Sequence, residues 1–158
     1  MLCRADIGRL WALCDWQKAV KVVKHDYTPK TTTKFFGQTQ SVYPRKNWSS
    51  LILFNNRRCT ALTLKYVNEA SPADLHRFNW LEDEEIGYLP MEWNHLVGEY
   101  DYNQDAKIVH FTLGSPCLQD YKDCDYADEW KQEYERMTFA KDRVQETVLR
   151  PNMKISEK

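Results

Sequence analysis

The sequence predicts a single α/β domain, with a mixed sheet flanked by helices and at least some parallel strands. Short apolar runs bounded by turn residues alternate along the chain with stretches of helical periodicity, which is typical of partly parallel sheets. The chain has 158 residues, of which 42% are hydrophobic and 13% aromatic, enough for a substantial core. We therefore expect one domain over residues 1–150 and a polar tail over residues 151–158.

The chain opens on a predicted helix over residues 5–14. Ile7, Leu10, Trp11 and Cys14 are spaced i, i+3, i+4 and i+7, so they form one apolar stripe that we expect to face the core. This order is unusual for a complete domain, because an α/β sheet normally opens on a buried strand.

Four apolar runs are predicted as strands, and three further stretches as helices. Leu51-Ile52-Leu53-Phe54 is the most apolar run, which indicates a strand buried on both faces. Thr63 is a suitable cap for the helix that follows it, and Pro72 stands near the start of the next one. The other strands cover residues 19–23, 86–89 and 107–112, the helices residues 64–70, 74–81 and 126–137, and a loop residues 28–34.

Charge and cysteine usage narrow the classes of function. The 22 basic and 23 acidic residues give a net charge of −1, so the chain lacks the basic excess of a nucleic-acid-binding protein. No apolar run approaches the length of a membrane span. The five cysteines are scattered without paired metal-binding spacing, which indicates free thiols in a reducing compartment and predicts a cytoplasmic protein.

His110 is the first candidate for chemistry. It lies near the end of the predicted strand 107–112, and Gly114 follows in a turn, so its imidazole should point toward the carboxyl edge of the sheet, where ligands bind in open α/β folds. A neutral imidazole there suits a divalent metal such as Mn²⁺. Taken alone, this segment favours a histidine that is hydrogen-bonded within the core over a metal ligand.

Three other segments offer polar groups beside strands. Trp93 and Asn94 follow Pro90, where a tryptophan ring can stack on a sugar and an amide can bond a hydroxyl. Arg45 and Lys46 lead into Asn47-Trp48-Ser49-Ser50, with two cations and two hydroxyls suited to phosphate or sugar groups. Asp74 and His76 can serve together as a base and its orienting partner. Each segment also has a plainer interpretation. The first can be a structural turn with a packed tryptophan, the second a solvated strand entry, and the third a surface ion pair.

Asp123 and Asp125 resemble a metal clamp in spacing only. Such a pair should end an apolar strand, whereas this one stands at the mouth of the helix predicted over residues 126–137. Helix capping and compensation of the helix dipole explain it more simply.

The order of these segments resembles the later half of GT-A-type glycosyltransferases, especially those similar to family 8, the glycogenin and galactosyltransferase group. The resemblance rests on Asn-Trp-Ser-Ser before a strand that ends Leu-Phe-Asn55, on a Leu-Pro-x-x-Trp-Asn turn, and on His110-Phe-Thr-x-Gly-x-Pro. It covers residues 1–116. It implies a GT-A-like mixed sheet without its N-terminal nucleotide-binding strands.

The resemblance also implies a reaction and its site. A nucleotide-sugar donor, in this family a UDP-sugar, gives its sugar to a hydroxyl acceptor such as a glycan, with retention at the anomeric carbon. The strand that ends at Asn55 lines the sugar site, and the turn at Trp93 and Asn94 supports it. The histidine that matches His110 binds Mn²⁺, or Mg²⁺, together with two upstream aspartates, and the metal neutralises the leaving diphosphate.

Two departures from the family pattern modify this expectation. Relatives carry a lysine after the glycine turn, where this chain reads Ser115-Pro116-Cys117, so Arg45 or Lys46 would have to replace that cation. The aspartate–any–aspartate motif belongs just before a segment like Met1–Ile7. We therefore expect weak or no transfer by this chain alone, and a homo-oligomer or a second chain that covers the exposed sheet near residues 5–14.

Two alternatives stay open. The chain can be a non-enzymatic carbohydrate-binding or assembly module built on half of the fold, in which case sugars should stabilise it without Mn²⁺. It can also use Cys117, Cys124 and His110 as a metal or redox site.

Overall fold

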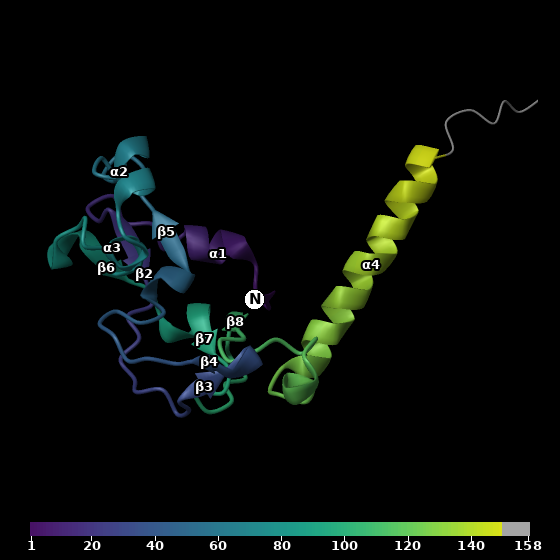
Figure 1. The fold of residues 1–158 in the computed structure, drawn as a ribbon. Helices are drawn as coiled ribbons and strands as arrows, with labels where there is room; N and C mark the ends of the chain where they lie inside the picture. Colours follow the sequence, from purple (N-terminus) through teal and green to yellow (C-terminus); the bar gives the residue numbers. More distant parts are fainter. Residues whose placement is uncertain (150–158) are drawn as a thin grey trace, which may run out of the picture. The chain divides into compact units, whose positions relative to one another are not determined.

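The computed structural model describes the backbone of residues 1–149 and the side chains of residues 1–139. Within them the protein is a small mixed α/β structure with mixed sheets and a few helices (Figure 1). The chain divides into two compact units, Met1–Ser115 and a second that begins at Pro116. The expected domain over residues 1–150 thus divides at Pro116, and the expected tail over residues 151–158 lies outside the described residues.

The sheet that positions the candidate site has β2 (Val20–Val22) at its centre. Its neighbours are β5 (Ile52–Phe54), which is antiparallel to it, and β6 (Ile86–Tyr88), which is parallel. The parallel pairing expected from the sequence is therefore confirmed. The expectation that residues 51–54 are buried on both faces is wrong, because β5 is an edge strand with Phe54 42% exposed.

A second sheet carries His110. It has the order β1 (Leu2–Cys3), β8 (Ile108–His110) and β7 (His95–Leu96), with β1 antiparallel and β7 parallel to β8. Its outer strands have two residues each, too short for a hydrophobic period to reveal them.

A small hairpin interrupts the loop expected over residues 28–34. It consists of β3 (Thr33–Lys34) and β4 (Gln38–Thr39), joined by the 3-10 turn η1 (Phe35–Gly37). The Phe35 N–H donates to the Leu113 carbonyl at 2.9 Å. This bond ties the hairpin to the segment that follows β8.

The helices agree with the sequence in number and less well in extent. The first, α1 (Ile7–Trp11), is shorter than predicted and buries only Leu10, whereas Ile7 and Trp11 are 58% and 65% exposed. The expectation that the apolar stripe faces the core is therefore wrong. The predicted helix over residues 126–137 is the first half of α4 (Ala127–Leu149), which belongs to the second unit.

Two short helices begin with the caps that the sequence offers. Thr63 caps α2 (Leu64–Glu69) by accepting a hydrogen bond from the Tyr66 N–H, as predicted. Ser71 caps α3 (Pro72–His76), which ends well before residue 81. Four further 3-10 turns complete the described fold: η2 (Trp48–Ser50), η3 (Asp83–Glu85), η4 (Met91–Asn94) and η5 (Gln119–Tyr121). No helix among residues 1–149 is both long and apolar enough to cross a bilayer.

Gly98 holds a conformation that only glycine accepts there. Its φ is +82°, and a Cβ atom would lie 2.6 Å from Leu113 Cδ1. We expect Gly98→Ala to lower the free energy of unfolding by about 2–3 kcal/mol, because backbone strain and a clash add. Gly37 (φ +68°) has nothing within 4 Å, so Gly37→Ala should cost only about 1 kcal/mol from strain. Urea denaturation measures both, and equal losses would contradict the clash.

Candidate site at the ends of strands β2, β6 and β8

Three chain segments meet where β2 ends. Because β5 is antiparallel to β2, with Ile52 opposite Val22, the turn η2 that precedes β5 lies at this edge. Strand β6 is parallel to β2 and ends at the same edge, where the Leu89 N–H donates to the Val22 carbonyl at 2.8 Å. Turn η4 follows directly. The carboxyl ends of parallel strands are where ligands bind in open α/β sheets.

Asn94 joins the three segments. It is fully buried, and its Nδ2 lies 3.0 Å from His25 Nε2 and 2.7 Å from Ser50 Oγ. Ser50 Oγ in turn donates to the Asn47 carbonyl at 2.7 Å. Because Asn94 donates to Nε2, the neutral imidazole of His25 keeps its proton on Nδ1.

Two tyrosines extend this network toward the surface. Tyr100 OH lies 3.0 Å from His25 Nδ1, and its ring stacks on the imidazole at a centroid distance of 5.8 Å. Tyr27 OH accepts a hydrogen bond from Asn47 Nδ2 at 2.6 Å. Burial, with the Glu99 carboxylate nearby, raises the pKa of both phenols, that of Tyr100 to about 12. Both therefore stay neutral hydrogen-bonding groups at pH 7. We call His25, Tyr27, Asn47, Ser50, Asn94 and Tyr100 the polar cluster.

His110 lies beside the polar cluster at the end of β8. Asn47 Nδ2 is 3.4 Å from Thr112 Oγ1, two residues further along the chain. Burial, the chain's first amine and Lys34 lower the pKa of His110 to about 4, so its ring is neutral at pH 7. Its Nδ1 is buried and has no hydrogen-bond partner among the described residues, and the same holds for Asn94 Oδ1. Each atom is therefore a buried polar atom whose hydrogen-bonding capacity the described residues leave unused.

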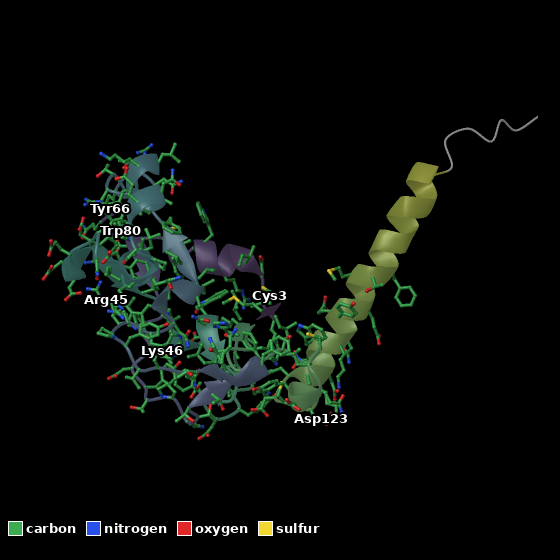
Figure 2. The ribbon with its side chains drawn as sticks, in the orientation of Figure 1. Cys3, Arg45, Lys46, Tyr66, Trp80 and Asp123 are labelled. Atoms are coloured by element: carbon green, nitrogen blue, oxygen red, sulfur yellow. The ribbon has the colours of Figure 1, made fainter. Side chains whose placement is uncertain are left out.

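Two cations, Arg45 and Lys46, stand at the rim of the cluster (both are labelled in Figure 2). They differ in the hydrogen bonds that hold them. Arg45 is held by the carboxylate of Asp83 and by the Arg77 carbonyl. Lys46 donates to a single carbonyl, that of Ser41, at 2.9 Å. Lys46 is therefore the better candidate for an anionic ligand.

A cavity of about 630 Å³ opens beside these groups, and its lining includes His25, Tyr27 and Lys46. Burial lowers the pKa of Lys46, and the positive charge of Lys34 lowers it further. Because these two lysines repel each other, an anion bound near them would be stabilised by both charges.

Most of the residues that the sequence proposed for binding lie at this edge. Asn47, Asn94 and His110 are described above, and Trp48 Nε1 donates to the His25 carbonyl at 2.8 Å. Gly114 is buried after β8. Ser49 lies further out, with its Oγ 2.9 Å from His76 Nδ1 on α3.

Three proposed residues lie elsewhere or serve the fold. Asn55 is at the opposite end of β5, where its Nδ2 donates to the Trp16 and Lys18 carbonyls. The expectation that it lines one site with Asn47 does not fit this register, because the two residues flank opposite ends of a strand. Trp93 is 1% exposed within the core cluster, so its ring offers no face to a sugar.

Asp74, proposed as a catalytic base or orienting residue, stabilises the start of α3. Its carboxylate accepts hydrogen bonds from Ser71 Oγ at 2.6 Å and from Asn79 Nδ2 at 2.8 Å. These bonds, that of Ser71 first, lower the pKa of Asp74. The carboxylate is therefore a poor proton acceptor at neutral pH.

The sequence analysis missed half of the polar cluster. His25 and Tyr27 come two and four residues after the predicted strand 19–23, whereas His110 lies inside the predicted strand 107–112. Their position close to a strand end is the signal that could have found them. Tyr100 follows the two-residue strand β7 and has no comparable indication in the sequence.

The described residues do not form a complete metal site by themselves. No group of three His, Cys, Asp or Glu side chains gathers anywhere in the part of the chain that the structure describes. His110 Nδ1 fits a metal as a single unpaired nitrogen. A complete coordination sphere would need oxygen ligands from a diphosphate and from carboxylates that these residues do not bring together.

Acidification should unfold the protein through its buried histidines. Burial first, and neighbouring positive charges second, lower the pKa of His25 and His110 from 6.5 to about 4. The unfolded chain takes up protons first, so stability is complete above about pH 6.5 and is lost as the pH falls toward 4. The loss is on the order of 3 kcal/mol for each residue. Urea denaturation between pH 7 and 4 measures it. His110→Gln should flatten the dependence and the surface variant His76→Gln should not; equal effects would contradict the assignment.

Comparison with known proteins shows that this chain is similar in sequence to a plant protein. It is 49% identical over 138 residues to Protein CDI of Arabidopsis thaliana, in an alignment that covers 83% of this chain and 53% of that protein. The chain thus spans about half the length of this curated relative. No protein-family model matches the chain, and no solved structure matches it.

Proposed function

We propose that this chain forms one side of the donor site of a GT-A-like glycosyltransferase, at the ends of β2, β6 and β8. The residues that bind the donor are Asn47, His110 and Lys46, and the fully buried Asn94 holds their segments together. The donor is a nucleotide-sugar, with UDP as the nucleotide that the sequence resemblance favours. The acceptor is a hydroxyl group of a glycan or another molecule.

One observation carries the proposal, namely the position of Met1. Strands β1 and β8 pair with Leu2 opposite Val109 and Cys3 opposite Ile108, so the register continued by one residue brings Met1 opposite His110. The effect of the chain's first amine on the pKa of His110 agrees with this proximity. The resemblance puts the aspartate motif just before a segment like Met1–Ile7. In a protein that carries this motif, its carboxylates would therefore arrive beside the matching histidine.

The cluster has groups suited to a sugar diphosphate. Neutral amides and phenols donate and accept hydrogen bonds without the desolvation cost of a buried charge. The unpaired His110 Nδ1 is a candidate ligand for a cation. Lys46 supplies a positive charge for the phosphates, in place of the lysine that relatives carry after the glycine turn.

A divalent cation, when bound, would neutralise charge on the leaving diphosphate. The residues of this chain have other tasks. His110 would hold its neutral imidazole toward the phosphates, and the amide of Asn47 would orient the sugar. Tyr100 and Ser50 would keep Asn94 and His25 in one rotamer each through the bonds described above.

Calorimetric titration of the purified chain with UDP-glucose and UDP-galactose, with and without Mn²⁺, tests the proposal. We expect binding that needs Mn²⁺ and weakens at least tenfold in His110→Ala. His76→Ala, a histidine of α3 outside the cluster, is the matched control and should bind as the natural chain does. Binding of free sugars that ignores Mn²⁺ would favour the non-enzymatic carbohydrate-binding module, and equal binding by both variants would refute the proposed role of His110.

A further inference from the structure

A second cavity opens at the other end of β2 and β5, away from the polar cluster. It has a volume of about 370 Å³, and its lining includes Trp11, Trp16 and Phe54. These side chains are 65%, 71% and 42% exposed. Three exposed aromatic rings around one cavity are unusual in a protein surface, where large apolar side chains are mostly covered or scattered.

The loop that carries Trp16 is held in place by other side chains. Asn55 Nδ2 and Arg58 Nε both donate to the Trp16 carbonyl, at 3.2 Å and 2.8 Å. Asp15 Oδ1 accepts from the Gln17 N–H at 2.9 Å. The ring of Trp16 is thus exposed on a backbone fixed from both sides, which lowers the entropy cost of binding a ligand there.

The cavity lining has an excess of positive charge. It includes three cationic side chains, Lys18, Lys21 and Arg57, and one carboxylate, that of Asp15. Each lysine gives one hydrogen bond to a carbonyl, Lys18 to Glu84 and Lys21 to Leu13, both at 2.7 Å, so each ammonium keeps further donors.

Gly87 on β6 leaves the space that the side chains of Lys18 and Lys21 occupy. A Cβ atom at this glycine would lie 2.8 Å from Lys21 Cγ and 3.0 Å from Lys18 Cγ. The two lysine stems therefore pack directly over the backbone of β6. This packing holds both side chains in the cavity lining rather than leaving them free in solvent.

We infer that this cavity binds an anionic carbohydrate, meaning a sugar ring that carries a carboxylate or a phosphate. Flat aromatic rings accept the apolar face of a sugar, and its hydroxyls can donate to the Asp15 carboxylate and the Asn56 amide. Arg57 and the two lysines match the anionic group. The site is independent of the proposed donor site, because its residues flank the opposite ends of the same strands.

Tryptophan fluorescence of the full chain tests this inference with three probes: digalacturonic acid for the carboxylate, glucose 6-phosphate for the phosphate, and maltose as the neutral sugar. We expect at least one charged probe to quench the emission with a Kd at least tenfold below that of maltose. Arg57→Gln should weaken that probe at least fivefold, and Trp16→Phe should remove most of its signal. Both side chains are at the surface, so both variants should keep the melting temperature.

Arg9→Gln, an exposed arginine of α1 outside the cavity lining, is the matched control and should leave the affinity unchanged. His110→Ala should also leave it unchanged, which separates this site from the donor site. Quenching that is equal for maltose and the charged probes, or no quenching by any probe, would overturn the inference. Tighter binding of adenosine monophosphate than of either charged sugar would overturn the assignment to carbohydrate.

Discussion

Replacing Trp93 with alanine should lower the free energy of unfolding by about 4 kcal/mol, the largest loss that we expect from a single substitution. The ring is 1% exposed and packs with Leu10, Val23, Leu89 and Ile108 in one core cluster. Removing a buried tryptophan loses its burial and leaves a cavity that the core fills only in part. Lys107 Nζ also lies 5.1 Å from the ring centroid, and this cation–π contact is lost as well.

Urea denaturation of Trp93→Ala and Trp93→Phe measures this effect. Trp93→Phe should lose less than half as much free energy of unfolding as Trp93→Ala, because it retains an aromatic ring in the core. Trp16→Ala is the matched control, since a tryptophan that is 71% exposed should cost within about 0.5 kcal/mol. If Trp93→Ala instead left stability unchanged and weakened sugar binding alone, the ring would be a ligand platform and its placement in the core would be wrong.

Asn94→Ala should cost about 3 kcal/mol, although the side chain is small. Its amide is fully buried, and its loss leaves His25 Nε2 without its donor and Ser50 Oγ without one of its partners. A buried group left without its hydrogen bond costs about 1–3 kcal/mol, and two such groups and a small cavity add. The control Asn56→Ala removes an exposed asparagine and should cost within about 0.5 kcal/mol.

Asn94→Asp gives a sharper test of the same bonds. A carboxylate cannot donate to His25 Nε2, so the imidazole must carry a proton on Nε2 to bond it, and the added negative charge should raise the pKa of His25. The variant should then be less stable than the natural chain at pH 8 and recover part of the difference near pH 5.5. A difference in stability that does not change with pH would contradict the hydrogen bond between Asn94 and His25.

Sequence alone located the strands that build the site but not their neighbours. β2, β6 and β8 were predicted because apolar runs end at polar residues or at Pro90, and that is a local property. β1 and β7 have two residues each, and only pairing with β8 defines them. The burial of β5 was overestimated because the sequence shows how apolar a strand is and not whether a partner covers its edge.

The same distinction explains the site residues. Asn47, Asn94 and His110 were proposed from the sequence because each stands near the end of a predicted strand, where ligands bind in open α/β sheets. Asn55 also follows a predicted strand. Because β5 is antiparallel to β2, however, Asn55 lies at the opposite edge of the sheet, and the sequence does not show the direction of β5. Asp74 looked reactive beside His76, yet its bonds to Ser71 and Asn79 give it a capping role.

Proton NMR of the histidine rings tests the central claim most directly, because Mn²⁺ is paramagnetic and broadens signals near it. The chain has four histidines, His25, His76, His95 and His110, and they can be assigned with single substitutions. On adding UDP with a trace of Mn²⁺, the account predicts that the ring signals of His110 broaden first and those of His76 stay sharp. Broadening of His76 before His110, or no selective broadening at saturating UDP, would contradict a donor site at the ends of β2, β6 and β8.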